Sequence, residues 1–195
     1  MIRRFLMVSL LGLAALGCQS RQPSESSLVD DTLNEFVSGA RIGATYGEAM
    51  QRIASLTFGP NSSTSPGGEI PGAKLGFRRF SLRLGLPSYE SSPDSSETVR
   101  WIELWSPSRA SADSVGSYLT TSLGVIPDTI CLEFQGRPRS RVVRWQVGDA
   151  GAALETPLGE ELNYSRLVFF GGNWDRSEHH VSEGRVGCGA STARP

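Results

Sequence analysis

The amino-acid sequence predicts an α+β domain built on one twisted, mostly antiparallel sheet of five or six strands. We expect two N-terminal helices and one later helix to pack on one face of that sheet. Six runs read as strands, and three segments repeat apolar residues at helical spacing. Most connections between the strands are shorter than the dozen or more residues that a parallel crossover needs. The domain is expected to span residues 28–171.

The expected helices begin and end at recognisable residues. In "SLVDDTLNEFVSG" the apolar residues share one helical face, and Gly39 is a suitable C-terminal cap. In "TYGEAMQRIASL" Thr45 and Glu48 have the spacing of a capping box. In "SADSVGSYLTTSLG" Ser111 is the expected N-cap and Gly124 follows the last turn.

The strand-like runs are short and lie between turn-forming residues. They are "FRRFSLRLGL" (77–86), "TVRWIELWSP" (98–107), "TICLEF" (129–134), "RVVRWQV" (141–147), "AALET" (152–156) and "SRLVFFG" (165–171). Residues 59–76 are dense in Gly, Pro and Ser, which predicts a long surface loop. Residues 172–195 show little periodicity, so we expect a loop or tail there.

The first residues have the order of a secretory signal. Arg3 and Arg4 are followed by an apolar run and then by small residues. The apolar run is shorter than the roughly 20 residues that a membrane-spanning helix needs. Its end, the "ALGC" of residues 15–18 (Ala15, Leu16, Gly17 and Cys18), resembles the lipobox of bacterial lipoproteins. The alternative is an ordinary cleaved signal in which Cys18 is incidental or forms a disulfide.

The lipoprotein resemblance implies a location in the cell envelope. Residues 1–17 would be the signal peptide, and Cys18 would carry acyl chains such as palmitate and anchor the chain to a membrane. Gln19 resembles the residue found after the cysteine in lipoproteins of the Gram-negative outer membrane, which would place the domain in the periplasm. Residues 18–27 are small and polar and are expected to form a tether.

Composition limits the partners and the size of the domain. Removing residues 1–17 leaves 178 residues (195 minus 17), enough for one domain with a hydrophobic core. Losing Arg3 and Arg4 takes the formal net charge from −1 to −3 (−1 minus 2), with both signs interspersed. Because no basic face is evident, we expect no nucleic-acid partner.

The two remaining cysteines are expected to pair. If Cys18 is acylated, Cys131 and Cys188 are left together in an oxidising compartment. A disulfide between them would contribute on the order of 4 kcal/mol in the chain-entropy model. The alternative is that Cys188 lies in a tail and stays unpaired.

No catalytic motif is evident, so we expect a protein that is not an enzyme and uses no cofactor or metal. His179 and His180 are adjacent, and neighbouring residues rarely bind one ion because they point in different directions. Glu103 is expected to face solvent on the uncovered side of the sheet. The alternative function is an envelope hydrolase or metal-dependent enzyme whose site combines scattered residues such as these three.

The uncovered face of the sheet is the candidate binding surface. Trp101 and Trp105 share one side of their strand, and Arg79 and Arg83 alternate outward on the strand before it. Aromatic residues with arginines are typical of binding hot spots, so we expect an envelope protein or a cell-wall component as partner. The alternative is that both tryptophans belong to the core, because tryptophan is usually mostly buried.

The segment "RIGATYGEAMQRI" carries a second resemblance. Gly43 and Thr45 match the Gly-x-Thr motif of the SmpA/OmlA-like envelope lipoproteins, which are outer-membrane assembly proteins, and of the related β-lactamase-inhibitor-like fold. In those proteins the motif joins two helices that precede an antiparallel sheet. The resemblance implies a non-catalytic binding or assembly module, and the extra helix and strands expected here depart from the pattern.

Overall fold

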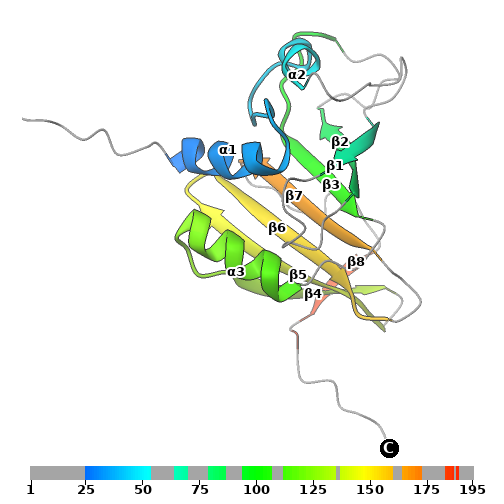
Figure 1. Cartoon of the computed structure of the whole chain (residues 1–195). Helices are drawn as coiled ribbons and strands as arrows, with labels where there is room; N and C mark the ends of the chain where they lie inside the picture. The colour runs from blue at the N-terminus through cyan, green and yellow to red at the C-terminus, as the bar shows by residue number, and fades with distance from the viewer. Residues whose placement is uncertain are drawn as a thin grey trace, which may run out of the picture.

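The computed structural model describes residues 25–53, 64–69, 79–86, 94–106, 112–134, 137–159, 164–172, 183–186 and 188. Its helices are α1 (Glu25–Phe36), α2 (Tyr46–Arg52) and α3 (Ala112–Leu123). Its strands are β1 (Thr64–Glu69), β2 (Arg79–Gly85), β3 (Trp101–Ser106), β4 (Asp128–Phe134), β5 (Arg137–Val147), β6 (Ala150–Pro157), β7 (Ser165–Gly171) and β8 (Glu183–Val186). They form one sheet in the order β1-β2-β3-β7-β6-β5-β4-β8, and every neighbouring pair is antiparallel (Figure 1).

The predicted class, an α+β fold with three helices and an antiparallel sheet, is confirmed, and all six strand-like runs form strands, β2 to β7. The described part of the sheet has two further strands, because β1 lies in the expected loop 59–76 and β8 in the expected tail 172–195. Both are edge strands without clear apolar alternation, and β1 contains Pro66 and two glycines. Pairing with a neighbouring strand therefore outweighs local propensity there.

The first helix starts earlier than expected. It begins at Glu25, inside the stretch 18–27 that was expected to be tether. Its first three residues, Glu-Ser-Ser, are all polar and give no apolar periodicity that would extend the predicted helix. The second helix begins as predicted, because the Thr45 side chain accepts from the Glu48 backbone N–H and the Glu48 carboxylate accepts from the Thr45 N–H.

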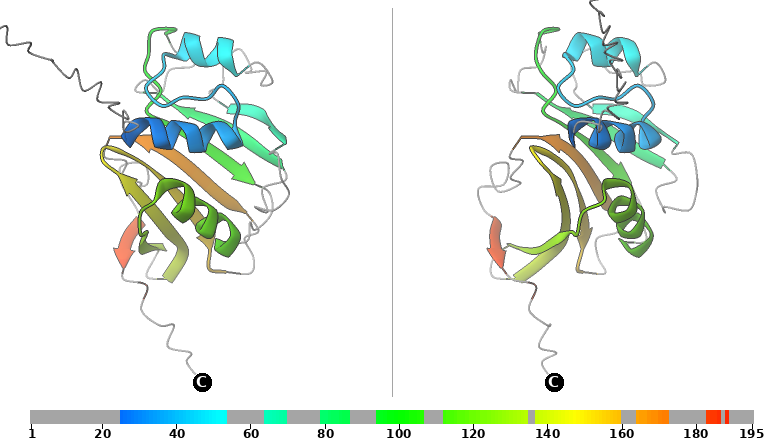
Figure 2. Two further views of the ribbon diagram at one scale, coloured as in Figure 1. Left: turned by 60° about the vertical axis from the view of Figure 1, so that its left-hand side comes forward. Right: turned by 90° about the vertical axis from the view of Figure 1, so that its left-hand side faces the viewer.

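One face of the sheet is covered by α1 and α3, which lie side by side across it (Figures 1 and 2). Leucines aligned by the strand register form a buried row across four strands on this face: Leu82, Leu104, Leu167 and Leu154. Ala49 in the middle of α2 and Ile53, the C-cap of that helix, belong to the same core. Trp145 is fully buried beneath α3, and its indole N–H donates to the Thr120 hydroxyl at 2.9 Å.

The two covering helices are also joined to each other. The Phe36 ring of α1 packs against Tyr118 of α3 and Phe169 of β7, with centroid distances of 5.6 and 5.5 Å. The Tyr118 hydroxyl donates to the Glu35 carboxylate at 2.6 Å. Burial, and then the Glu35 carboxylate, raises the pKa of Tyr118 to about 12, so this hydroxyl stays a donor at neutral pH.

The opposite face of the sheet is buried as well. A second apolar cluster lies there, formed by Leu132, Val142, Ala153, Val168 and Phe170. Neighbouring residues of β7 therefore point into two different cores, Phe169 into the first and Phe170 into the second. This explains why "LVFF" in β7 is a continuous apolar run rather than an alternating one.

The Cys131–Cys188 disulfide, one of the two alternatives for these residues, is present, with a Cα–Cα distance of 5.1 Å. It joins the middle of β4 to the residue two positions after β8. Within the described residues, no helix is long and apolar enough to span a membrane. Cys18 and the rest of residues 1–24 lie outside the described residues, so the lipobox remains a prediction.

Gly116 offers a test of this packing, because it lies inside α3 and glycine is a poor helix former. A Cβ at this position would lie 3.8 Å from Trp145 Cζ2, an ordinary contact. Gly116→Ala should therefore stabilise the fold by up to about 1 kcal/mol, measured by urea unfolding. Gly151→Ala is the contrasting variant, because its Cβ would overlap the Trp145 carbonyl oxygen and it should destabilise. Equal effects of the two changes would contradict the packing described here.

Candidate functional site

Three charged residues meet inside the sheet, on the face opposite α1 and α3. Arg166 of β7 is the register partner of Trp105 on β3 and of Glu155 on β6. Glu103 lies two residues from Trp105 on β3 and points to the same side. Only 3% of Arg166 and 2% of each glutamate is exposed, so three charges lie almost entirely out of water.

The arginine bridges the two carboxylates. Arg166 Nη2 forms an ion pair with Glu103 Oε1, and Arg166 Nη1 lies 3.6 Å from Glu155 Oε2. The remaining oxygens also accept hydrogen bonds, from Trp105 Nε1 to Glu103 Oε2 at 3.1 Å and from the Tyr164 hydroxyl to Glu155 Oε1 at 3.3 Å. Each of the four carboxylate oxygens thus lies against the guanidinium or a hydrogen-bond donor.

Aromatic rings flank this network on one side. The Trp105 and Tyr164 rings pack at 5.2 Å, and the Arg166 guanidinium carbon lies 5.4 Å from the centre of the Trp105 ring. At that distance the ring face attracts the cation. Arg166 Nε and Ser140 Oγ are among the buried polar atoms that have no hydrogen-bond partner in the described residues.

The expected position of Glu103 is therefore wrong. It does share a face with Trp101 and Trp105, as alternation predicted, but it is buried and ion-paired rather than solvent-facing. The sequence analysis missed Arg166 and Glu155. Each is the single charged residue of a strand whose other residues are mostly apolar or small. This signal could have suggested a buried ion pair.

The four proposed binding residues lie at neighbouring positions of β2 and β3. Trp101 and Trp105 are both half-buried, so neither is a freely exposed anchor, and Trp101 packs against the second apolar cluster. Arg83 is the register partner of Glu103, and Arg79 lies at the start of β2 opposite Glu69. The side chains of Arg79 and Arg83 are outside what the structure describes. Most of the described residues on the face that holds the tryptophans are buried.

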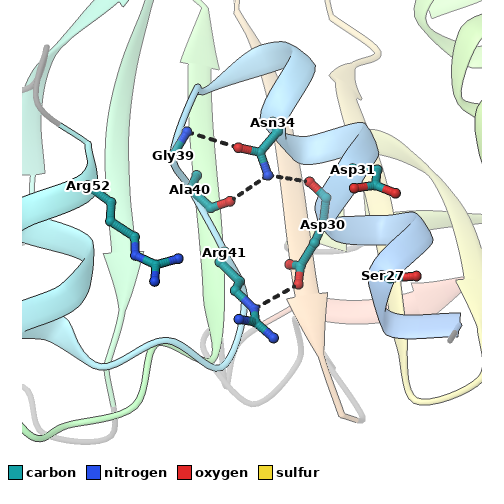
Figure 3. A pocket seen from close by; sticks show the side chains of 8 residues that line it. All are labelled: Ser27, Asp30, Asp31, Asn34, Gly39, Ala40, Arg41 and Arg52. Carbon is teal, nitrogen blue, oxygen red and sulfur yellow. Dashed lines mark hydrogen bonds and ion pairs between the residues drawn. The ribbon is translucent and has the colours of Figure 1, made fainter. Parts of the chain in front are cut away.

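A second candidate site is an open polar cleft between α1 and the segment that leads into α2 (Figure 3). Its volume is about 290 Å³, and it is lined by Ser27, Asp30, Asp31, Asn34, Gly39, Ala40, Arg41 and Arg52. The guanidinium groups of Arg41 and Arg52 point into the same space in Figure 3, while Asp31 and Ser27 lie on the α1 side. The cleft therefore presents both signs of charge to a ligand.

The α1–α2 connection is held in place by two α1 side chains. Asn34 accepts from the Gly39 N–H at 2.9 Å and donates to the Ala40 carbonyl at 3.0 Å (Figure 3). Gly39 has φ +85°, and a Cβ there would overlap the Arg52 carbonyl oxygen, so this close approach requires glycine. Asp30 accepts from the Ile42 N–H at 2.9 Å. These contacts position the backbone that carries Arg41 and Arg52.

Asp30 is the partly buried charge of the cleft. Burial raises the pKa of Asp30 above its ordinary value of 3.8, while the Ile42 N–H and the Arg41 guanidinium act in the opposite direction. Arg41 Nε lies 3.4 Å from Asp30 Oδ2, and its side chain is 62% exposed. Arg52 and Asp31 are also exposed, so two charges of opposite sign remain accessible to a ligand.

Metal binding finds no support in the described residues, which contain no group of three or more His, Cys, Asp and Glu able to hold an ion. His179 and His180 lie outside the described residues. No family model matches the chain, and no curated protein or solved structure is similar to it.

Replacing Arg166 tests the buried network. Arg166→Met would leave two carboxylates buried without their cation, which should cost about 3–5 kcal/mol of unfolding free energy. Arg141→Met, on an exposed arginine of β5, should change stability by less than about 0.5 kcal/mol. Both losses are measured by urea unfolding, and equal losses in the two variants would show that the network contributes nothing.

Replacing Arg41 tests the electrostatics of the cleft. Because Arg41 opposes the effect of burial, Arg41→Gln should raise the pKa of Asp30 further, as seen by ¹³C NMR titration of its carboxyl carbon. A pKa raised by folding means that ionisation of Asp30 disfavours the fold, so stability should fall more steeply as the pH rises above about 3.8. Arg52→Gln is the control and should leave the pKa of Asp30 nearly unchanged. An unshifted or lowered pKa in Arg41→Gln would contradict the described contact.

Proposed function

We propose that this chain is a lipid-anchored protein of the cell envelope that binds a partner and carries out no catalysis. The observation that carries the proposal is the sequence Ala15 to Cys18 followed closely by a folded domain. Helix α1 starts at Glu25, seven residues after Cys18, so the connection can extend over about 25 Å at most. Acyl chains on Cys18 would therefore keep the domain close to the membrane surface.

The polar cleft is the binding site that best fits this arrangement. Ser27, Asp30 and Asp31 come from the first two turns of α1, so the cleft begins within about 9 Å of the point where the tether enters the domain. Its volume is at the small end for ligand pockets, which favours a short segment or chain end over a large molecule. The Trp101 and Trp105 face supports binding less well, because its charged residues Glu103, Glu155 and Arg166 are buried and paired with each other.

The charges of the cleft indicate the chemistry of the ligand. Arg52 on α2 suits a carboxylate, and Asp31 on α1 suits an ammonium group across the cleft from it (Figure 3). A short peptide with both groups meets these requirements. In the bacterial envelope the peptides of the cell wall have this character, so we propose a cell-wall peptide as the ligand.

Co-sedimentation with purified peptidoglycan tests the proposal. Arg52→Gln and Asp31→Asn should each weaken binding roughly tenfold, because a hydrogen bond to a charged group contributes about 1.5–3 kcal/mol. Arg141→Gln removes an exposed charge from β5 and should bind like the unmodified protein. Unaltered binding in both cleft variants, or no sedimentation of the unmodified protein, would show that the cleft does not bind cell-wall peptides.

A further inference from the structure

Strand β8 pairs with the sheet over only four positions. It is an outermost strand whose four residues, Glu183 to Val186, pair with residues 131–134 of β4. By comparison, β5 and β6 pair over eight positions. A strand this short, with Gly184 in its interior, gives few ladder hydrogen bonds and loses much conformational freedom on pairing. Pairing with β4 therefore stabilises β8 only weakly.

The disulfide lies where it can stabilise the pairing of β8 with β4. Cys131 is the register partner of Val186, and Cys188 follows Val186 by two residues, so the bond closes the end of the short ladder. Ten residues, 173–182, lie between Gly172, the last described residue after β7, and the start of β8. The bond thus holds β8 at one register against β4.

We propose that the Cys131–Cys188 disulfide is a redox latch that keeps β8 over the edge of β4. Reduction frees β8, and the uncovered edge of β4 then pairs with β4 of a second copy of this chain. An open edge of a sheet is a template for another strand. Because β8 covers only four of the seven residues of β4, an antiparallel β4–β4 contact forms a longer ladder than β8 does.

The chemistry of opening follows from the exposure of the two cysteines. Cys188 is exposed whereas Cys131 is 5% exposed, so an incoming thiolate of a dithiol reductant attacks the Cys188 sulfur. The S–S bond breaks, Cys131 leaves as a thiolate and takes up a proton, and a mixed disulfide forms on Cys188. The second thiolate of the reductant then attacks the reductant sulfur of that mixed disulfide. Cys188 leaves as a thiolate and takes up a proton. Two protein thiols are formed, and the reductant ends as a disulfide.

Hydrogen exchange with mass spectrometry tests the latch on the full mature chain. After reduction, backbone amides of residues 183–186 should exchange at least tenfold faster than in the oxidised protein. Amides of β6 and β7 should be unchanged, because those strands lie inside the sheet, paired on both sides. The double variant Cys131→Ser/Cys188→Ser should behave like the reduced protein and respond to no reductant. Equal protection of residues 183–186 in both redox states would overturn the proposal, and so would general loss of protection in β6 and β7.

Sedimentation velocity tests the contact between copies on the same samples. The oxidised protein should be a monomer, whereas the reduced protein and the double variant should form a dimer whose amides in residues 128–134 become protected as concentration rises. A reduced protein that stays monomeric, with β8 released, would overturn the pairing of β4 with a second copy. Amide protection that rises with concentration in strands other than β4 would also overturn the pairing of β4 with a second copy.

Discussion

The fold depends on burying both faces of one antiparallel sheet. Phe169 points into the core beneath α1 and α3, and Phe170, its neighbour on β7, points into the second cluster. A sheet buried on both faces leaves no solvated side for a charged residue of its central strands. Arg166 meets this constraint by lying between Glu103 and Glu155, and the three residues come from three neighbouring strands. The ion network is thus a consequence of the burial, and it joins β3, β7 and β6.

Much of the architecture could be predicted because its signals are local. The capping box at Thr45 and Glu48 depends on four consecutive residues, and both of its hydrogen bonds are present. Alternation placed Trp101, Glu103 and Trp105 on one side of their strand, and the register confirms it. The disulfide could be expected from the number of cysteines and from the compartment implied by the first 18 residues.

Other features depend on contacts between distant segments, which no local pattern reveals. Alternation assigns a residue to a face but does not say whether that face is covered, so Glu103 was expected in solvent. Strands β1 and β8 carry glycine and charge, and they form by pairing with a neighbouring strand. The cleft could not be predicted either. It forms because Asn34 and Asp30 hold the α1–α2 connection against α1, which brings Arg41 and Arg52 into one space.

In the proposed function, acyl chains on Cys18 attach the domain to a membrane. Hydrophobic transfer contributes about 0.8 kcal/mol per buried methylene of an acyl chain, so several chains on one residue would give durable attachment. The most direct measurement is the intact mass of the mature protein purified from membranes, with fragmentation of its N-terminus. The account predicts a chain that begins at Cys18 and carries a thioether-linked diacylglycerol. A mature chain that begins at any other residue, or an unmodified Cys18, would contradict it.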